Sequence, residues 1–171
     1  MPCSSDAAIR KLPNKWATWG VRESQSLHPL QIKLLSRGLE LLKVGGKISY
    51  STCSLSPIED EAVVAAVLKM YGDKIKLLNV QLPGFKFQEG LTSWKFMHLK
   101  SEEEPEGESF FDTFESIEQV PDEIMYNKKT KVVKETMFEN FYAPELKQEL
   151  TKCLRVMPHH QNTSGFFITI I

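Results

Sequence analysis

The sequence contains few cysteines and no long apolar segment. Its three cysteines, at positions 3, 53 and 153, are too few and too widely spaced for a disulfide framework. They also lack the close pairing of ligands that structural zinc sites show. No apolar run is long enough for a signal peptide or a membrane span. These absences predict a protein of a reducing, intracellular compartment, with no membrane anchor and no metal centre.

The chain also lacks a large net charge of either sign, since its formal charge is −1. The chain as a whole therefore has no electrostatic preference for nucleic acid. Its charges are unevenly distributed, because basic residues prevail between positions 10 and 47, whereas residues 101–127 contain acids and no lysine or arginine. The first segment is suited to face phosphates and the second is not. With 171 residues, 42% of them hydrophobic, the chain has the size of one domain or part of one.

Apolar spacing predicts alternating helices and strands. Leucines recur at helical spacing over residues 27–42, and a glycine pair then precedes a strand over 47–52. A second helix follows over 57–72, and the short apolar run 75–80 predicts another buried strand. The final run, 166–171, is apolar throughout, as in a strand covered on both faces. This order of elements predicts an α/β sheet with right-handed crossovers.

Cys53 lies where the predicted strand 47–52 ends. Ser56 is a favourable N-cap, Pro57 suits the first helical position, and Glu59 stands where its carboxylate completes a capping box. Cys53 is thus placed at the carboxyl end of a strand, just before a helix amino terminus, which is where open α/β sheets bind ligands. The positive end of a helix favours a thiolate over a thiol. Position alone makes Cys53 a candidate nucleophile.

Other polar and aromatic residues have structural interpretations. The acids at 59–61 complement the dipole of the predicted helix. His28 and Pro29 fall in the first turn of the first helix, where we expect the histidine to be partly exposed. Trp16 and Trp19 lie among basic residues, a pattern that allows stacking on nucleic-acid bases, although we expect them to pack a loop onto the core.

The second half of the chain is less regular. Residues 91–97 are expected to form an edge strand, and the acidic segment 101–109 a solvated, flexible loop. A short helix over 143–154 presents leucines on one face, and Cys153 is expected to pack near it. Residues 155–165 form a polar loop before the last strand, which brings an arginine, two histidines and amides to one edge of the sheet.

Three separated motifs together resemble one known family. They read Pro2-Cys3-Ser4, then Tyr50-Ser51-Thr52-Cys53-Ser54 with Pro57 to Val63, and finally Arg155 to Thr163 with Gly165-Phe166-Phe167. This combination is similar to the catalytic part of the Sun-domain (Nop/Sun) RNA cytosine carbon-5 methyltransferases, and closest to their eukaryotic transfer-RNA (Misu-like) branch. A Thr-Cys-Ser box with a Pro-Cys box upstream is a specific signature. The resemblance covers nearly the whole chain except the acidic loop.

The resemblance implies a fold, a reaction and a location. The fold would be the carboxyl-terminal part of a Rossmann-like, S-adenosylmethionine-dependent methyltransferase sheet, with residues 1–171 forming a partial catalytic domain. The family methylates carbon 5 of cytosine in RNA after a cysteine thiolate adds to carbon 6, and this branch indicates tRNA as the substrate. By resemblance, Cys53 is the nucleophile and Cys3 assists product release. A nuclear or nucleolar location is implied as well.

A base inside folded RNA reaches such a thiol only when it is flipped out, which requires contacts to the phosphates around it. Arg10, Lys11 and Arg155 are the candidates for these RNA contacts. His159 either positions the base or hydrogen-bonds its own loop, and the amides at 161 and 162 leave the same alternatives open.

Parts of the family's pattern are absent. The family places an aspartate two residues before its Pro-Cys, where this chain has only Met1 before Pro2, and its glycine-rich cofactor loop and ribose-binding acid lie further upstream. The chain is therefore expected to be a fragment that is inactive alone, with a sheet edge and an apolar face uncovered. Two other classes are considered: a non-catalytic RNA-binding or interaction module, and a thiol-redox protein, which Cys53 fits in position but for which a Cys-x-x-Cys partner is lacking.

Overall fold

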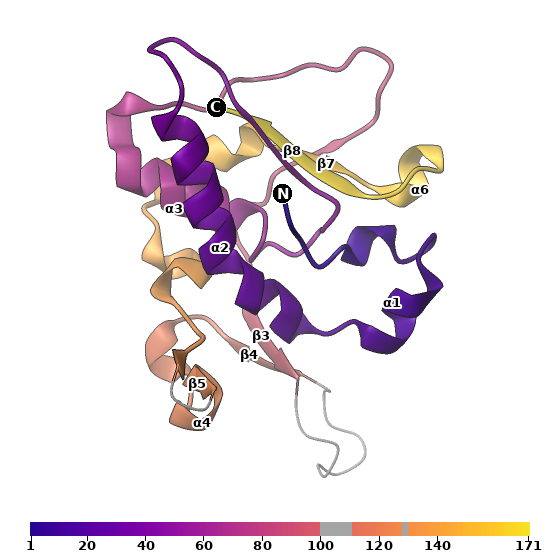
Figure 1. Ribbon diagram of the computed structural model, residues 1–171, viewed down its shortest axis with the longest axis vertical. Coiled ribbons are helices and arrows are strands. Elements are labelled where there is room, and N and C mark those ends of the chain that lie inside the picture. The colour runs from indigo at the N-terminus through magenta and orange to yellow at the C-terminus, as the bar shows by residue number, and fades with distance from the viewer. Residues whose placement is uncertain (100–110, 128–129) are drawn as a thin grey trace.

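The computed structural model describes residues 1–99, 111–127 and 130–171. A four-stranded sheet in the order β1-β8-β7-β2 forms its centre (Figure 1). The strands are β1, Ser49–Thr52; β8, Phe166–Ile170; β7, Leu154–Val156; and β2, Gln88–Glu89. Every neighbouring pair is antiparallel, so β1 and β7 run in the same direction with β8 between them. The prediction of an α/β fold is confirmed, whereas the predicted acidic loop at 101–109 lies outside the described residues.

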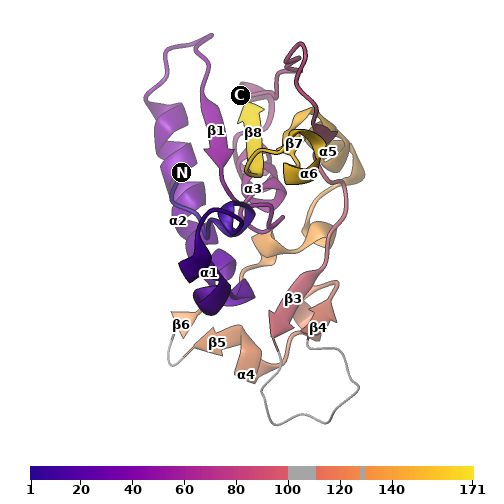
Figure 2. The same ribbon diagram turned by 90° about the vertical axis from the view of Figure 1, so that its right-hand side faces the viewer.

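Two long helices, α2 (Val21–Glu40) and α3 (Glu61–Tyr71), pack against each other and against the sheet. Residues 61–68 of α3 are all buried, because α2 covers one side of this helix and residues 135–152 contact another. The main core joins apolar side chains of α2, β1, α3 and β8. Figure 2 shows β1 and β8 side by side, with α2 beside β1.

A second, smaller apolar cluster lies next to the hairpin of β3 (Phe96–Leu99) and β4 (Phe111–Phe114). Phe96 stacks on Phe138 at its centre, with the ring centroids 4.9 Å apart. The remaining short elements are α1, Pro13–Thr18; α4, Asp122–Met125; α5, Pro144–Glu149; α6, Pro158–Gln161; β5, Tyr126–Asn127; and β6, Thr130–Lys131.

The first long helix differs from its prediction in both start and buried face. It begins at Val21, so Pro29 lies inside the helix and not in its first turn. Leu30 and Leu34 are exposed, and the helix buries a mostly polar set instead: Ser24, Gln25, His28, Gln31, Leu35 and Ser36. The expectation that His28 is partly exposed is therefore wrong. Leucine spacing failed here because this part of α2 packs against hydrogen-bonding groups, for which hydropathy carries no signal.

The helix predicted from Pro57 begins only at Glu61. Residues 57–60 form a turn in which the N–H groups of Glu59 and Asp60 both donate to the Ser56 carbonyl, at 3.0 and 3.2 Å. Asp60 has a non-helical backbone, with φ −108° and ψ −94°. The predicted capping box is wrong, because the Glu59 carboxylate points to residues of other segments.

Several shorter predictions are also corrected. Residues 75–80 form no strand, although the Leu78 N–H donates to the Ile170 carbonyl of β8 at 2.9 Å. In β8, buried and more exposed residues alternate, so one face is covered and not both. The helix predicted over 143–154 ends at Glu149, and a 3-10 turn then leads into β7. The edge strand predicted over 91–97 is displaced, since β3 begins only at Phe96, whereas Cys153 is buried as expected.

Candidate active site

Cys3 and Cys53 lie side by side although 50 residues separate them in the chain. Their sulfur atoms are 3.3 Å apart, and both side chains are half-buried free thiols. The Ser5 hydroxyl lies 3.3 Å from the sulfur of Cys53 and 3.8 Å from that of Cys3. Ser5 adopts the left-handed conformation, with φ 59°, which is uncommon for a residue with a side chain. Cys53, which has no nearby cysteine in the sequence, therefore has Cys3 as a neighbour in the folded chain.

Backbone hydrogen bonds hold the segment around Cys3 along the segment around Cys53. The amino terminus of Met1 donates to the Ser51 carbonyl at 3.1 Å, and the Ala7 N–H donates to the Cys53 carbonyl at 3.2 Å. The Asp6 carboxylate accepts the Leu55 N–H at 2.9 Å. Because β1 is an edge strand of the sheet, its open side receives the amino-terminal segment.

The buried carboxylate of Glu59 hydrogen-bonds to both of these segments. Glu59 is 0% exposed, and its Oε1 atom accepts the Ser4 N–H at 2.9 Å and the Gln31 amide at 2.9 Å. Its Oε2 atom accepts the hydroxyls of Ser4 and Ser54, the latter at 2.8 Å. The interpretation of this acid as a simple complement to the helix dipole is wrong. A run of three acids at the start of an otherwise apolar helix is the sequence signal that could have indicated this network.

The two acids that follow are equally buried and serve other partners. Glu61 holds Arg155 through two parallel bonds, each of 2.6 Å, and Arg155 also donates to the Leu55 carbonyl at 3.0 Å. Asp60 accepts the Thr52 hydroxyl at 2.6 Å, while its other oxygen lies 3.9 Å from the guanidinium of Arg155. Burial, and then the neighbouring charge of Glu61, raise the pKa of Asp60 well above its usual value.

Burial also raises the pKa of the Cys3 thiol, and its hydrogen bond with Cys53 adds to this. Cys3 is therefore a neutral thiol at neutral pH. Burial raises the pKa of Cys153 further, to about 12, so this third cysteine is an unreactive core residue.

The candidate RNA contacts separate into two groups. Arg10, Lys11 and His159 are exposed, and Arg10 donates to the Asn162 side chain at 2.8 Å, which ties the amino-terminal segment to the loop after α6. Arg155, by contrast, is 5% exposed and fully engaged with Glu61 and Leu55. The prediction of an RNA contact at Arg155 therefore disagrees with the structure, in which this residue supports the Cys53 segment.

We expected the two amino-terminal tryptophans to pack on the core, but both are exposed. Trp16, in α1, is 70% exposed, and Trp19 is 44% exposed. Large exposed aromatic rings beside basic residues are a surface suited to stacking on bases.

Residues 1–112 match the family model described as 16S rRNA methyltransferase RsmB/F. The chain belongs to the RsmB/F family. Several members of this family align with nearly the whole length of this chain, and they are named as tRNA cytosine-C5 methyltransferases. The multisite-specific enzyme of Saccharomyces cerevisiae is 37% identical over 99% of the chain, and trm4b of Schizosaccharomyces pombe is 40% identical over all of it. The tRNA (cytosine(34)-C(5))-methyltransferase of Drosophila melanogaster is 35% identical over the full chain. The predicted resemblance is thus confirmed.

The chain spans about a fifth of the length of these RsmB/F relatives, between 21 and 23%. Among solved structures, a methyltransferase homologue from Pyrococcus horikoshii is 26% identical and covers 84% of this chain and 30% of its own, with a TM-score of 0.46.

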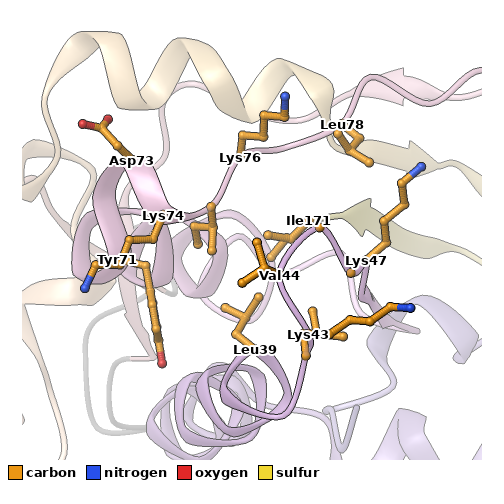
Figure 3. A pocket seen from close by; sticks show the side chains of 14 residues that line it. Leu39, Lys43, Val44, Lys47, Tyr71, Asp73, Lys74, Lys76, Leu78 and Ile171 are labelled. Carbon is orange, nitrogen blue, oxygen red and sulfur yellow. The ribbon is translucent and has the colours of Figure 1, made fainter.

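A separate hollow of about 540 Å³ opens at the other end of β1 from Cys53. Figure 3 shows Leu39, Val44 and Ile171 near its centre and lysines around it. The lysines are Lys43, Lys47, Lys74 and Lys76, and they outnumber the one acid, Asp73. This hollow is thus basic and distant from the paired thiols.

Two kinds of site are not found among residues 1–99, 111–127 and 130–171. Within these ranges, no cluster of three or more histidine, cysteine or acidic side chains is arranged to hold a metal ion. Nor does any helix there have both the length and the apolar character for crossing a membrane.

Proposed function

We propose that this chain carries the thiol part of an active site that methylates carbon 5 of cytosine in RNA, with tRNA as the substrate class. The observation that carries the proposal is the 3.3 Å separation of the Cys3 and Cys53 sulfur atoms. The names of the S. cerevisiae and D. melanogaster relatives support the substrate class.

Cytosine carbon 5 is a weak nucleophile, and a covalent intermediate makes it stronger. The Cys53 thiolate attacks carbon 6, so a sulfur–carbon bond forms and the electron pair of the 5,6 double bond moves toward carbon 5. Cys53 suits this role because it follows β1 and is half-buried, open enough to meet a flipped base.

Cys3 is assigned to product release, in which the carbon 5 proton leaves and the bond between Cys53 and carbon 6 breaks. Its sulfur is close enough that a ring bound to Cys53 lies against it. Because the pKa of Cys3 is raised, it remains a neutral thiol beside the adduct, which leaves the nucleophilic role to Cys53.

The methyl donor expected for the family is S-adenosylmethionine, but the hollow that contains the glycine pair does not fit it. The one glycine pair, Gly45-Gly46, lies in the lysine-lined hollow at the opposite end of β1 from Cys53. A basic hollow repels a cationic sulfonium. The chain alone is therefore proposed to be inactive and to need a donor site from a larger protein.

The RNA is proposed to contact Arg10, Lys11 and His159, which are exposed on the amino-terminal segment and α6. A nuclear or nucleolar location follows from the family resemblance and stays a prediction.

A chimera tests the proposed reaction. Residues 1–171 replace the matching segment of the S. cerevisiae relative, and transfer of a labelled methyl group to tRNA is measured. We expect transfer with the chimera, and a loss of at least about a thousandfold for Cys53→Ala, because the neighbouring Cys3 is held as a neutral thiol and does not replace the nucleophile. Undiminished transfer by Cys53→Ala contradicts the assignment.

The second candidate is a non-catalytic RNA-binding module, which the exposure of Trp16 and Trp19 beside Arg10 and Lys11 favours. For this function, the isolated chain binds tRNA with an affinity that falls as salt rises. Fluorescence anisotropy measures it, with Trp16→Ala expected to weaken binding by roughly fivefold to a hundredfold, as loss of one stacked base does. Absence of binding at low salt eliminates this candidate.

A further inference from the structure

We propose that Glu59 is a positioning residue that sets the distance between the Cys3 and Cys53 thiols. The proposal deepens the proposed function, since it concerns the same pair of sulfur atoms. It rests on contacts within this chain, however, and its test needs no RNA and no methyl donor.

The carboxylate contacts the residue that follows each cysteine. Ser4 comes directly after Cys3 and gives Glu59 both its N–H and its hydroxyl. Ser54 comes directly after Cys53 and gives its hydroxyl at 2.8 Å. The Glu59 side chain, in the turn before α3, thus holds both cysteine-bearing segments.

A third element fixes the other side of Cys3. The Gln31 amide, on α2, donates to the Glu59 carboxylate and to the Pro2 carbonyl, each at 2.9 Å. Cys3 is therefore held from both neighbours, by Gln31 at Pro2 and by Glu59 at Ser4. The carboxylate connects α2 and the two thiol segments into one hydrogen-bonded unit.

Burial makes this unit rigid. A fully buried carboxylate is tolerated only when donors replace its water, and Glu59 has four of them. When it is removed, the donors of Ser4 and Ser54 lose this acceptor while buried, and the Gln31 amide keeps only the Pro2 carbonyl, which favours movement of the segments toward water. The sulfur atoms then separate, because only bonds to neighbouring residues, such as that of the Ala7 N–H to the Cys53 carbonyl, are left to hold the two segments.

The rate at which the two thiols form a disulfide measures their positioning. With diamide as the oxidant, the Cys3 and Cys53 thiols together lose two electrons and two protons, a sulfur–sulfur bond forms, and diamide is reduced to its hydrazine. The product is detected as the loss of two hydrogen atoms by mass spectrometry, under conditions in which each variant remains folded. Cys153 is buried and serves as an internal control that stays reduced.

Glu59→Ala is expected to slow this rate at least about tenfold, since small displacements of reacting groups have large kinetic effects. Glu59→Gln is expected to stay within about threefold of the natural chain, because its carbonyl still accepts from Ser4 and Gln31 and the serine hydroxyls can accept from its amide. Ser54→Ala removes a single bond and gives a smaller slowing than Glu59→Ala, which provides a readout if Glu59→Ala does not fold.

Leu150→Ala is the control for general loss of stability, because Leu150 is fully buried in the main core and lies outside the Glu59 network. Its rate is expected to match that of the natural chain. The proposal is overturned if Glu59→Ala and Ser54→Ala oxidise at the natural rate, or if Leu150→Ala is slowed as much as Glu59→Ala. Neither result bears on methyl transfer by the chimera, so the two proposals fail separately.

Discussion

At the scale of residues, most of the buried polar side chains around the thiols form hydrogen bonds with one another. Ser4, Ser54 and Gln31 all donate to Glu59, and Arg155 pairs with Glu61, whereas the Gln31 Oε1 atom has no hydrogen-bond donor among the described residues. Such groups are stabilising only as complete sets, because one missing partner leaves a buried group unpaired. Asp60 shows the cost, since its second oxygen has no hydrogen-bond donor among the described residues and its pKa is raised.

His28 belongs to the same polar interior. It is 0% exposed, its Nδ1–H donates to the Ile58 carbonyl at 2.6 Å, and its Nε2 accepts the Thr136 hydroxyl at 2.8 Å. The bond from Thr136 requires a neutral ring, because a protonated Nε2 cannot accept. Burial lowers the pKa of His28 from 6.5 to about 4.

This shift predicts a dependence of stability on pH. Below pH 6.5 the unfolded chain binds a proton at His28 that the folded chain refuses until about pH 4. The contribution is therefore complete above pH 6.5 and is lost as the pH falls to about 4, by about 3 kcal/mol in total. Urea unfolding of the natural chain and His28→Gln at several pH values measures it. The variant, although less stable at pH 7, should lack this part of the decline; equal declines in both proteins contradict the assignment.

At the scale of elements, two predicted strands are present and one, over 75–80, is absent. The strand before Cys53 and the last strand were found from their β-branched and aromatic residues, and both are present as β1 and β8. The helices α2 and α3 were found, but their starts and the buried face of α2 were not. Hydropathy reports apolar burial alone, whereas α2 buries His28 and Gln31 through hydrogen bonds to distant segments.

Adjacent leucines of α2 test which face is buried. Leu34 is 43% exposed and Leu35 is 2% exposed. We expect Leu35→Ala to reduce the free energy of unfolding by about 2–5 kcal/mol through lost burial and a cavity. Leu34→Ala should change it by less than about 1 kcal/mol. Both are measured by urea unfolding of the full chain, and a larger effect at Leu34 than at Leu35 would place the wrong face in the core.

At the scale of the whole molecule, the site exists only through the fold. Cys53 was identified from its place after a strand, and its family motif indicated a second cysteine, but no spacing rule joins residues 50 positions apart. The structure joins them along the edge strand β1. The role of Arg155 could not be assigned from sequence, because the sequence does not distinguish an exposed arginine in a polar loop from one paired with a buried acid.

The covalent adduct is the most direct test of the roles of the two thiols. In the chimera with the S. cerevisiae relative, Cys3→Ala should accumulate a tRNA adduct that survives denaturing electrophoresis, because Cys53 still attacks while release is blocked. Cys53→Ala, alone or combined with Cys3→Ala, should give none. An adduct with Cys53→Ala and none with Cys3→Ala would exchange the two roles, and the absence of an adduct from both single variants would contradict the covalent mechanism.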